Sequence, residues 1–106
     1  MRRVDRSEKK MPKKWGNFCE VFGVNPRNRI LEFFLEMRGL DYTIGDVAKE
    51  TRLNRATTYN TMEELLNEGF IQETRKVSGG QLYTLNQNKK EVKILIKTFN
   101  DVLKKV

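Results

Sequence analysis

The stretch Thr43–Leu85, TIGDVAKETRLNRATTYNTMEELLNEGFIQETRKVSGGQLYTL, decides the fold of this chain. Its first part predicts a short helix that begins at Thr43. Asp46 stands three residues later, at the spacing of a capping box, in which two side chains accept each other's backbone N–H groups. The helical spacing stops at residues 52–54. We expect these three residues to form a tight turn, with Leu53 as an apolar plug between two helices.

A second helix is expected from Arg55 to about Glu68. Asn54 is a favourable N-cap, and Gly69 stands where a left-handed C-terminal residue is expected. Plotted at about 100° per residue, the sequence separates a buried side from an exposed side. The buried stripe consists of Thr58, Met62, Leu65 and Leu66, and the opposite side holds Ala56, Asn60, Glu63 and Asn67.

After the second helix the pattern acquires a period of two, which is the period of a strand. Two alternating runs, residues 70–77 and 81–85, flank Ser78, Gly79 and Gly80. Glycines between alternating runs predict a β-hairpin. A short helix, a tight turn, a second helix and a hairpin outline a winged helix-turn-helix. We therefore predict an α+β fold that is mainly α.

The N-terminal half of the second helix carries side chains that can read DNA. Asn can pair bidentately with adenine, Thr or Ala can contact the thymine methyl group, and Arg suits guanine or phosphate. The C-terminal half carries acids that phosphates would repel, so we expect the helix to enter a groove by its N-terminal end. The hairpin tip is cationic and can lie along a phosphate strand. The candidate DNA-binding residues are Thr43, Asn54, Arg55, Ala56, Thr57, Tyr59, Asn60, Arg75, Lys76, Ser78 and Gln81.

Helices are also expected before the motif. Large apolar residues at helical spacing begin at Trp15 and end before Gly23. Asn25 and Pro26 then start a helix over residues 27–38. That helix is apolar nearly all round except at Arg29, Glu32 and Glu36, which is typical of a central core helix. Residues 40–42 predict a brief first strand.

A terminal helix over residues 89–105 is expected after an N-cap at Asn88. Its apolar residues recur at steps of three and four, as in a coiled-coil seam. The seam could pack on its own domain, but so small a domain already has a core, so we expect it to pack between two subunits. The candidate dimer-interface residues are Trp15, Phe18, Phe22, Leu95, Phe99, Val102 and Leu103.

Size and charge indicate one domain with a basic arm. The chain has 106 residues, of which 38% are hydrophobic, so we expect a single domain over residues 15–106. Residues 1–14 hold seven basic and two acidic residues of a chain whose net charge is +7. We expect this segment to be a flexible arm that suits a polyanionic partner. No stretch has the length of a membrane span or a secretion signal, so we expect a cytoplasmic protein without a membrane partner.

The residues needed for most catalytic and metal sites are missing. The chain has one cysteine, Cys19, and no histidine. An internal disulfide, imidazole catalysis and the usual zinc sites are therefore excluded within one chain. The carboxylates are scattered, and Gly79 and Gly80 are better explained as a turn than as a phosphate loop. We expect no enzyme activity, no cofactor and no metal.

The run from Phe22 to Asn86 resembles the winged-helix transcription regulators of bacteria and archaea, of the MarR and ArsR kinds, and is most like their small archaeal members. The matching pieces are NPRNRILEFFLE, TIGDVAKETRLNRATTYNTMEELLNEGFI and ETRKVSGGQLYTLN. The resemblance implies that the helix of residues 55–68 enters the major groove and that the wing, residues 75–82, contacts the flanking backbone. It also implies that helices outside the motif form a homodimer. Some members sense metals through cysteine and histidine clusters, which this chain does not match.

These expectations describe a sequence-specific regulator that binds double-stranded DNA as a homodimer. The alternative is a winged-helix module that binds a protein within a larger assembly, or that acts as an architectural protein. In that alternative the basic arm binds nucleic acid without sequence preference. The two hypotheses differ in what they require of the exposed face of the helix over residues 55–68, because a protein-binding or architectural module needs no polar side chains that read bases there.

Overall fold

The structure, a computed structural model, describes residues 16–104, with side chains as far as residue 102. The basic arm, Trp15 and the side chain of Leu103 lie outside the described part. None of the described helices is long and apolar enough to cross a membrane. In chain order the elements are α2 (Asn17–Phe22), α3 (Pro26–Glu36), α4 (Ile44–Thr51), α5 (Arg55–Asn67), β1 (Ile71–Val77), β2 (Gly80–Leu85) and α6 (Lys90–Lys104).

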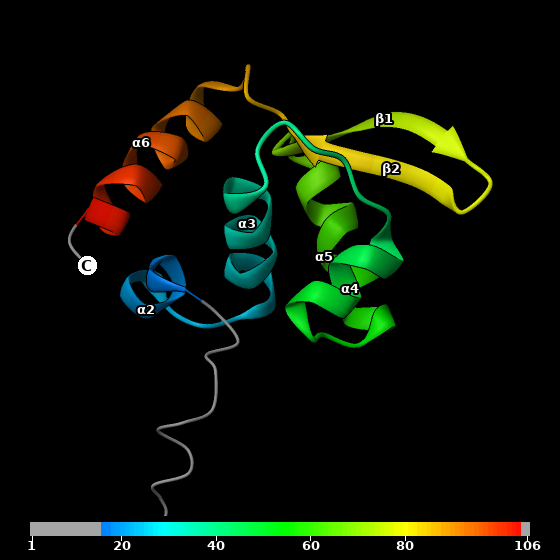
Figure 1. Ribbon diagram of the computed structural model, residues 1–106, viewed down its shortest axis with the longest axis horizontal. Helices are drawn as coiled ribbons and strands as arrows, with labels where there is room; N and C mark the ends of the chain where they lie inside the picture. Colours follow the sequence, from blue (N-terminus) through cyan, green and yellow to red (C-terminus); the bar gives the residue numbers. More distant parts are fainter. Residues whose placement is uncertain (1–15, 105–106) are drawn as a thin grey trace, which may run out of the picture.

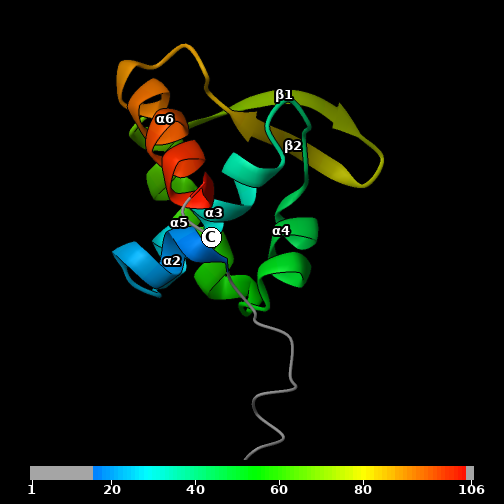
Figure 2. The ribbon, with the colours of Figure 1, turned by 60° about the vertical axis from the view of Figure 1, so that its left-hand side comes forward.

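Helix α3 occupies the middle of the molecule (Figure 1). Helices α2 and α6 pack against each other on one flank, as Figure 2 also shows. Helices α4 and α5 lie on the other flank, and the antiparallel hairpin of β1 and β2 projects away from them. This arrangement is a winged helix-turn-helix. The predicted fold class, α+β and mainly α, is confirmed.

Three helices begin where local sequence predicts. The Asn25 side chain accepts the N–H of Asn28 at 2.8 Å, and Pro26 follows it at the start of α3. Thr43 and Asp46 form the predicted capping box at the start of α4. Asn54 caps α5. Each cap satisfies backbone N–H groups that have no partner within the helix.

The turn between α4 and α5 contains a left-handed residue that is not glycine. Arg52 has φ 62° and ψ 30°. A side chain in this conformation costs roughly 1–2 kcal/mol, because Cβ crowds the following carbonyl oxygen. Leu53 follows and packs against the core, as the sequence predicts. The turn is therefore held by an apolar contact and accepts some backbone strain.

Two local predictions are wrong. Residues 40–42 do not form a strand, because only Tyr42 bonds across to Tyr83, through two backbone hydrogen bonds of 2.9 Å. Asn88 does not cap the last helix, which begins at Lys90 rather than at residue 89 and is described as far as Lys104, so its predicted end at residue 105 lies outside the described residues. The N–H of Asn88 bonds to the side chain of Asn86 instead, and the first turn of α6 starts from the carbonyl of Lys89.

The core is centred on α3. Ile30, Phe34 and Leu35 are fully buried on this helix. Leu65 from α5 and Val92 from α6 are equally buried, so the core extends to both flanks. The prediction that this segment is the central helix is confirmed. It ends at Glu36, a little before the predicted end at residue 38.

Glu32 is a buried acid with a structural role. The residue is only 4% exposed, and its carboxylate accepts the N–H of Gly16 at 2.7 Å and that of Cys19 at 3.1 Å. It thus binds the free backbone donors at the start of α2 and ties α2 to α3. Burial, followed by the neighbouring Glu32 charge, raises the pKa of the Cys19 thiol to about 12. Cys19 therefore stays protonated near neutral pH.

Two residues predicted at a dimer interface lie instead inside the domain. Phe18 is 3% exposed and Phe99 is 4% exposed, and their ring centroids are 6.4 Å apart. The guanidinium of Arg38 covers the Phe99 ring at 5.7 Å. Part of the seam on α6 therefore packs on α2 of the same chain. The periodicity was sufficient to identify the apolar face but not the element that covers it.

Replacing Glu32 by Ala should lower the free energy of unfolding by about 2–3 kcal/mol, because two backbone donors lose a charged acceptor. Glu32→Gln should lose less, since its amide oxygen can still accept one of them. Urea denaturation measures both. The control is Glu64→Ala, which removes an exposed acid from α5 and should change stability by less than about 0.5 kcal/mol. Equal effects of Glu32→Ala and Glu64→Ala would contradict the capping role.

Candidate nucleic-acid interface

The N-terminal half of α5 presents a polar face to solvent. Arg55, Ala56, Tyr59 and Asn60 are exposed, and Thr57 is half-buried. On the opposite side of the helix, the residues that face the core are Thr58, Thr61, Met62 and Leu65. The buried stripe thus includes Thr61, which was not predicted, while the predicted Leu66 is only partly buried against the core. The predicted reading residues of the helix lie together on the free side.

Two of the predicted DNA-reading residues, Asn54 and Tyr59, already have hydrogen-bonding partners within the chain. The Asn54 side-chain oxygen accepts the N–H of Thr57 at 2.7 Å, so its remaining donor is the amide NH2 group. A hydrogen bond to Glu63 raises the pKa of the Tyr59 hydroxyl. Tyr59 is 51% exposed, so its ring is free for contact although its hydroxyl has a partner. Asn60 and Arg55 are also exposed polar readers on this face.

A polar hollow separates the start of α4 from the tip of the hairpin. Its volume is about 200 Å³. It brings together Thr43, Arg55 and Gln81, which the sequence places in three different elements. We call it the wing hollow, and its walls are completed by Ile44, Gly45, Gly79, Gly80 and Tyr83.

Arg55 lies across the start of α4, beside Gly45. A Cβ at Gly45 would stand 3.4 Å from Nη1 of Arg55. The guanidinium thus lies at the N-terminal end of α4, which carries a partial positive charge. Thr43 uses its hydroxyl oxygen to accept the N–H of Asp46 at 3.1 Å, and its hydroxyl hydrogen remains a donor. These donors around an open hollow can bind an anionic oxygen.

Strand β1 is exposed along nearly its whole length, whereas β2 is mostly buried or half-buried. Every residue of β1 after Ile71 is exposed, including Lys76, and Ser78 is exposed in the turn. Gln81 is half-buried and directs its amide to the carbonyls of Arg75 and Leu82, both at 3.1 Å. Lys76 and Ser78 are therefore the predicted wing residues whose side chains are most available to a partner.

Arg75 is held by an acid that the sequence analysis missed. Its Nε lies 2.9 Å from Oδ2 of Asp41 and its Nη2 lies 3.2 Å from Oδ1. The Thr74 hydroxyl donates to the same Oδ2 at 2.7 Å. The bonds from Arg75 and Thr74 lower the pKa of Asp41 from 3.8 to about 2. No local pattern marks Asp41, because its partners are more than thirty residues away.

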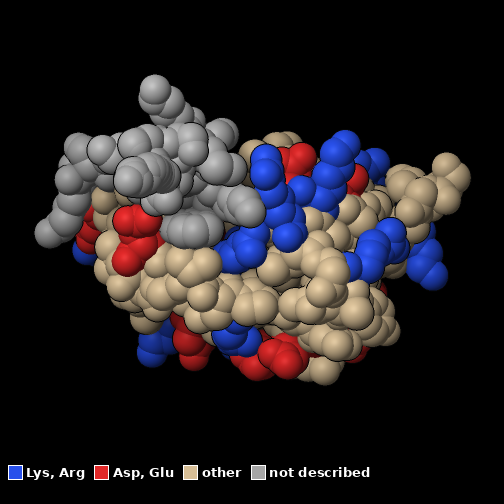
Figure 3. Space-filling model, turned by 90° about the horizontal axis from the view of Figure 1, so that it is seen from below, with Lys and Arg blue, Asp and Glu red and all other residues tan. Residues whose placement is uncertain are grey.

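On the face that Figure 3 shows, most basic side chains lie over one half of the molecule. Figure 3 views it from below and shows them over the half that holds α4, α5 and the hairpin. Exposed cations of these elements and their turn are Lys49, Arg52, Arg55, Arg75 and Lys76, of which Arg75 is paired with Asp41. The acids of α5 are exposed only from its middle onward, at Glu63, Glu64 and Glu68. The charge distribution therefore favours contact between an anion and the N-terminal end of α5.

Solved structures share this fold. No protein-family model and no curated protein sequence matches the chain. A predicted DNA-binding transcriptional regulator from E. coli is 20% identical, with 74% of this chain and 78% of that chain covered and a TM-score of 0.56. Reduced HlyU from Vibrio cholerae is 17% identical, with 78% and 81% covered and a TM-score of 0.59.

A MarR family transcriptional regulator from Silicibacter pomeroyi is 18% identical to this chain. The match covers 83% of this chain and 57% of that chain, with a TM-score of 0.58. At these identities the likeness is one of fold. The fold of this chain is a winged helix-turn-helix, as in these solved structures.

The carboxyl of Asp41 should titrate with a midpoint near pH 2, because hydrogen bonds from Arg75 and Thr74 favour its charged form. A lowered pKa stabilises the fold above the unfolded value of 3.8, and this contribution is lost as the pH falls toward about 2. Carboxyl-detected NMR measures the midpoint. In Arg75→Gln the midpoint should move up toward 3.8. Identical midpoints in the two proteins would show that Arg75 is not the cause.

Proposed function

We propose that this chain is a transcriptional regulator that binds a specific sequence of double-stranded DNA as a homodimer, without enzyme activity. The observation that carries the proposal is the free polar face at the N-terminal end of α5, bordered by the wing hollow and an exposed wing. The structural neighbours support it, since two of them are described as transcriptional regulators and one of these as DNA-binding.

The recognition helix in this proposal is α5. The major groove is wide enough to admit an α-helix, and its base edges distinguish all four base pairs. Asn60 and Arg55 are exposed donors on the leading part of the helix, and Ala56 and Thr57 offer methyl groups. The acids farther along would lie near phosphates if the helix entered by its other end. The N-terminal end of α5 therefore enters first, with Asn54 and Tyr59 at the margins of the contact.

The wing contacts the flanking backbone. Lys76 is exposed and Ser78 is a hydroxyl donor in the tip, so both suit phosphate oxygens. Between the wing and α5, the wing hollow offers the guanidinium of Arg55 and the hydroxyl of Thr43 to another phosphate. Such contacts fix the position of α5 in the groove, while the side chains of α5 select the sequence.

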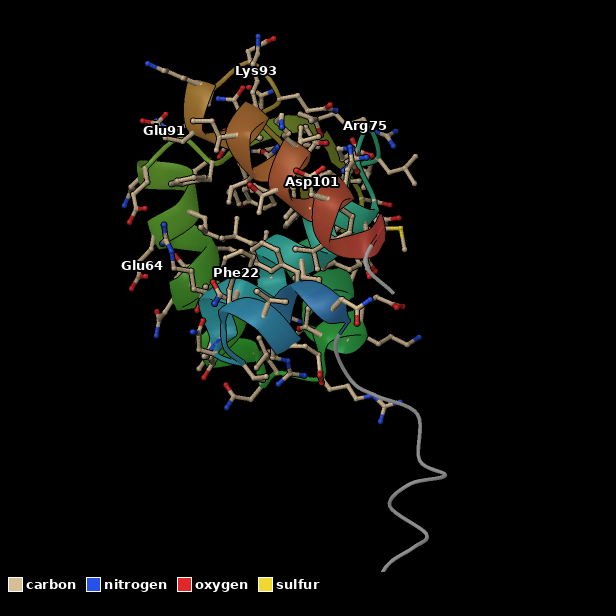
Figure 4. The ribbon with its side chains drawn as sticks, turned by 90° about the vertical axis from the view of Figure 1, so that its left-hand side faces the viewer. Phe22, Glu64, Arg75, Glu91, Lys93 and Asp101 are labelled. Carbon is tan, nitrogen blue, oxygen red and sulfur yellow. The ribbon has the colours of Figure 1, made fainter. Side chains whose placement is uncertain are left out.

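The dimer forms through the flank that holds α2 and α6. Figure 4 looks directly onto this flank. Phe22 is 50% exposed and Ile94 is 56% exposed. Val21 and Val24 are also exposed, and apolar surface of this kind often marks an interface.

An apolar groove of about 350 Å³ continues this surface. It lies between α3, α6 and the residue before β1, and is lined by Arg27, Leu31, Phe70, Glu91, Ile94 and Leu95. The Asn28 side chain donates to the carbonyls of Phe22 and Gly23, which places the end of α2 beside the first turn of α3. The exposed end of α2 therefore lies beside the helix that forms one wall of the groove. Val102 is half-buried on the same helix as Leu95 and belongs to the proposed interface.

Two copies joined through this flank would present two α5 helices. A symmetric dimer reads a pseudo-palindrome, with half-sites about one helical turn apart or a multiple of it. The basic arm of residues 1–14 can add contacts to phosphates that depend on salt but not on sequence. An architectural or protein-binding module remains the second candidate, and it is favoured only by the charge of that arm.

Selection of duplexes from a random pool by the full chain should recover an inverted repeat. Asn60→Ala should then weaken binding to the selected duplex by about 1–3 kcal/mol and relax the preference at one base pair. Affinity for the selected and the scrambled duplex measures both effects. The control is Asn67→Ala, which removes an exposed amide near the other end of α5 and should have little effect. An equal loss on every duplex would contradict base reading by Asn60, and the absence of any preferred sequence would favour the module.

Ile94→Asp should dissociate the dimer, because it places a charge at the apolar groove. We expect the dimer dissociation constant to rise about thirtyfold or more, as for removal of a central interface residue worth about 2 kcal/mol. Sedimentation velocity over a range of concentrations measures it. Lys93→Asp is the control, since Lys93 is exposed on the same helix but does not line the groove. A monomeric wild-type protein would refute the proposed dimer.

A further inference from the structure

The hairpin contains a β-bulge that changes its register halfway along. Ile71, Gln72 and Glu73 pair with Leu85, Thr84 and Tyr83, whereas Lys76 pairs with Gln81 and Val77 with Gly80. Thr74 and Arg75 therefore both lie opposite a single residue of β2, Leu82. A bulge of this kind re-aims side chains and bends the strand.

The side chains of Thr74 and Arg75 bind the same carboxylate. Neighbours in a regular strand point to opposite faces of the sheet. Here the Thr74 hydroxyl lies 2.7 Å from Oδ2 of Asp41, and the Arg75 guanidinium lies 2.9 Å from the same oxygen and 3.2 Å from Oδ1. Only the bulge lets both side chains reach one acceptor. Asp41 is therefore bonded to both side chains of the irregular segment.

Asp41 is itself fixed in place by β2. On one side of it, the Thr84 hydroxyl donates to the carbonyl of Leu40 at 2.8 Å. On the other side, Tyr42 forms its backbone bridge to Tyr83. The Asp41 side chain is only 19% exposed. The carboxylate is thus a fixed point to which the outer half of the hairpin can be attached.

The bulge determines the orientation of the outer wing, Lys76 to Gln81. Because side chains alternate along a strand, one extra residue turns every side chain beyond it to the opposite face. The orientation of Lys76 relative to α5 therefore depends on the bulge. Among the described residues, no ion pair involves Lys76, while the charge of Arg75 is matched by Asp41.

We propose that Asp41 is a positioning residue for DNA recognition: by binding Thr74 and Arg75 it fixes the bulge, and thereby the face of the outer wing that lies beside α5. This inference rests on the proposed DNA-binding function. Asp41 does not touch DNA. Arg75 serves the geometry of the wing, and Lys76 supplies the cation for the phosphate backbone.

The first test measures the register of the wing in the absence of DNA. In Asp41→Ala, NMR contacts across the strands between Lys76 and Gln81 should weaken or disappear, while those between Gln72 and Thr84 remain. Glu73→Ala is the matched control, because it removes an exposed acid beside the bulge that has no part in the Asp41 cluster. An unchanged outer register in Asp41→Ala would overturn the proposal.

The second test measures affinity for the selected and scrambled duplexes at several salt concentrations. The salt slope is the dependence of the logarithm of the binding constant on the logarithm of the salt concentration. Lys76→Gln should reduce this slope by about one, with little change in sequence preference. Asp41→Ala should lower the preference for the selected duplex about tenfold, since the wing no longer fixes the position of α5. Arg75→Gln should lower the preference for the selected duplex as much as Asp41→Ala does and should leave the salt slope unchanged. The double variant should show no further loss of preference.

The outcomes separate this inference from the function on which it rests. If Arg75→Gln reduces the salt slope as Lys76→Gln does, and Asp41→Ala keeps the wild-type preference, Arg75 contacts phosphate directly and the proposal is overturned. If the wild-type protein shows no preferred sequence, the proposed regulator function fails and Asp41 has no role in recognition. The register measurement then still decides whether Asp41 fixes the bulge.

Discussion

The packing of α5 against α3 is the interaction on which the rest of the structure depends. Thr58, Met62 and Leu65 on α5 are almost completely inaccessible, as are Ile30 and Phe34 on α3. At about 25 cal/mol per Å² of apolar surface, burying side chains of this size dominates the stability of a small domain. The burial also fixes the rotation of α5 about its axis. The opposite, polar side of the helix is left in solvent as a direct result.

The candidate interface depends both on helix caps between sequence neighbours and on contacts between residues far apart in the sequence. Caps at Thr43 and Asn54 set where α4 and α5 begin, and they bring Thr43 and Arg55 to the wing hollow. Contacts across the chain then place the other components. Glu32 attaches α2 to α3, and Asp41 attaches β1 to the segment before α4. Both acids bind donors that would otherwise lack a protein partner, so each one orders a segment rather than a single side chain.

The sequence predicts the features that depend on neighbours along the chain. The capping box, the Asn54 cap and the period of two after Gly69 are local, and the helix-turn-helix and hairpin follow from them. The roles of Glu32 and Asp41 depend on partners distant in sequence, which no spacing rule reveals. The periodicity of α6 likewise shows an amphipathic helix, but whether Phe99 meets its own chain or another is decided only by the fold.

The left-handed conformation of Arg52 shows how this turn balances stability against charge. Glycine would adopt φ 62° without steric cost, and it is the residue usually found where a helix ends in this way. Arginine instead accepts roughly 1–2 kcal/mol of strain and places an exposed cation at the entrance to α5. A sequence optimised for stability alone would not keep it. At this position glycine would give the more stable turn, whereas arginine gives the more cationic one.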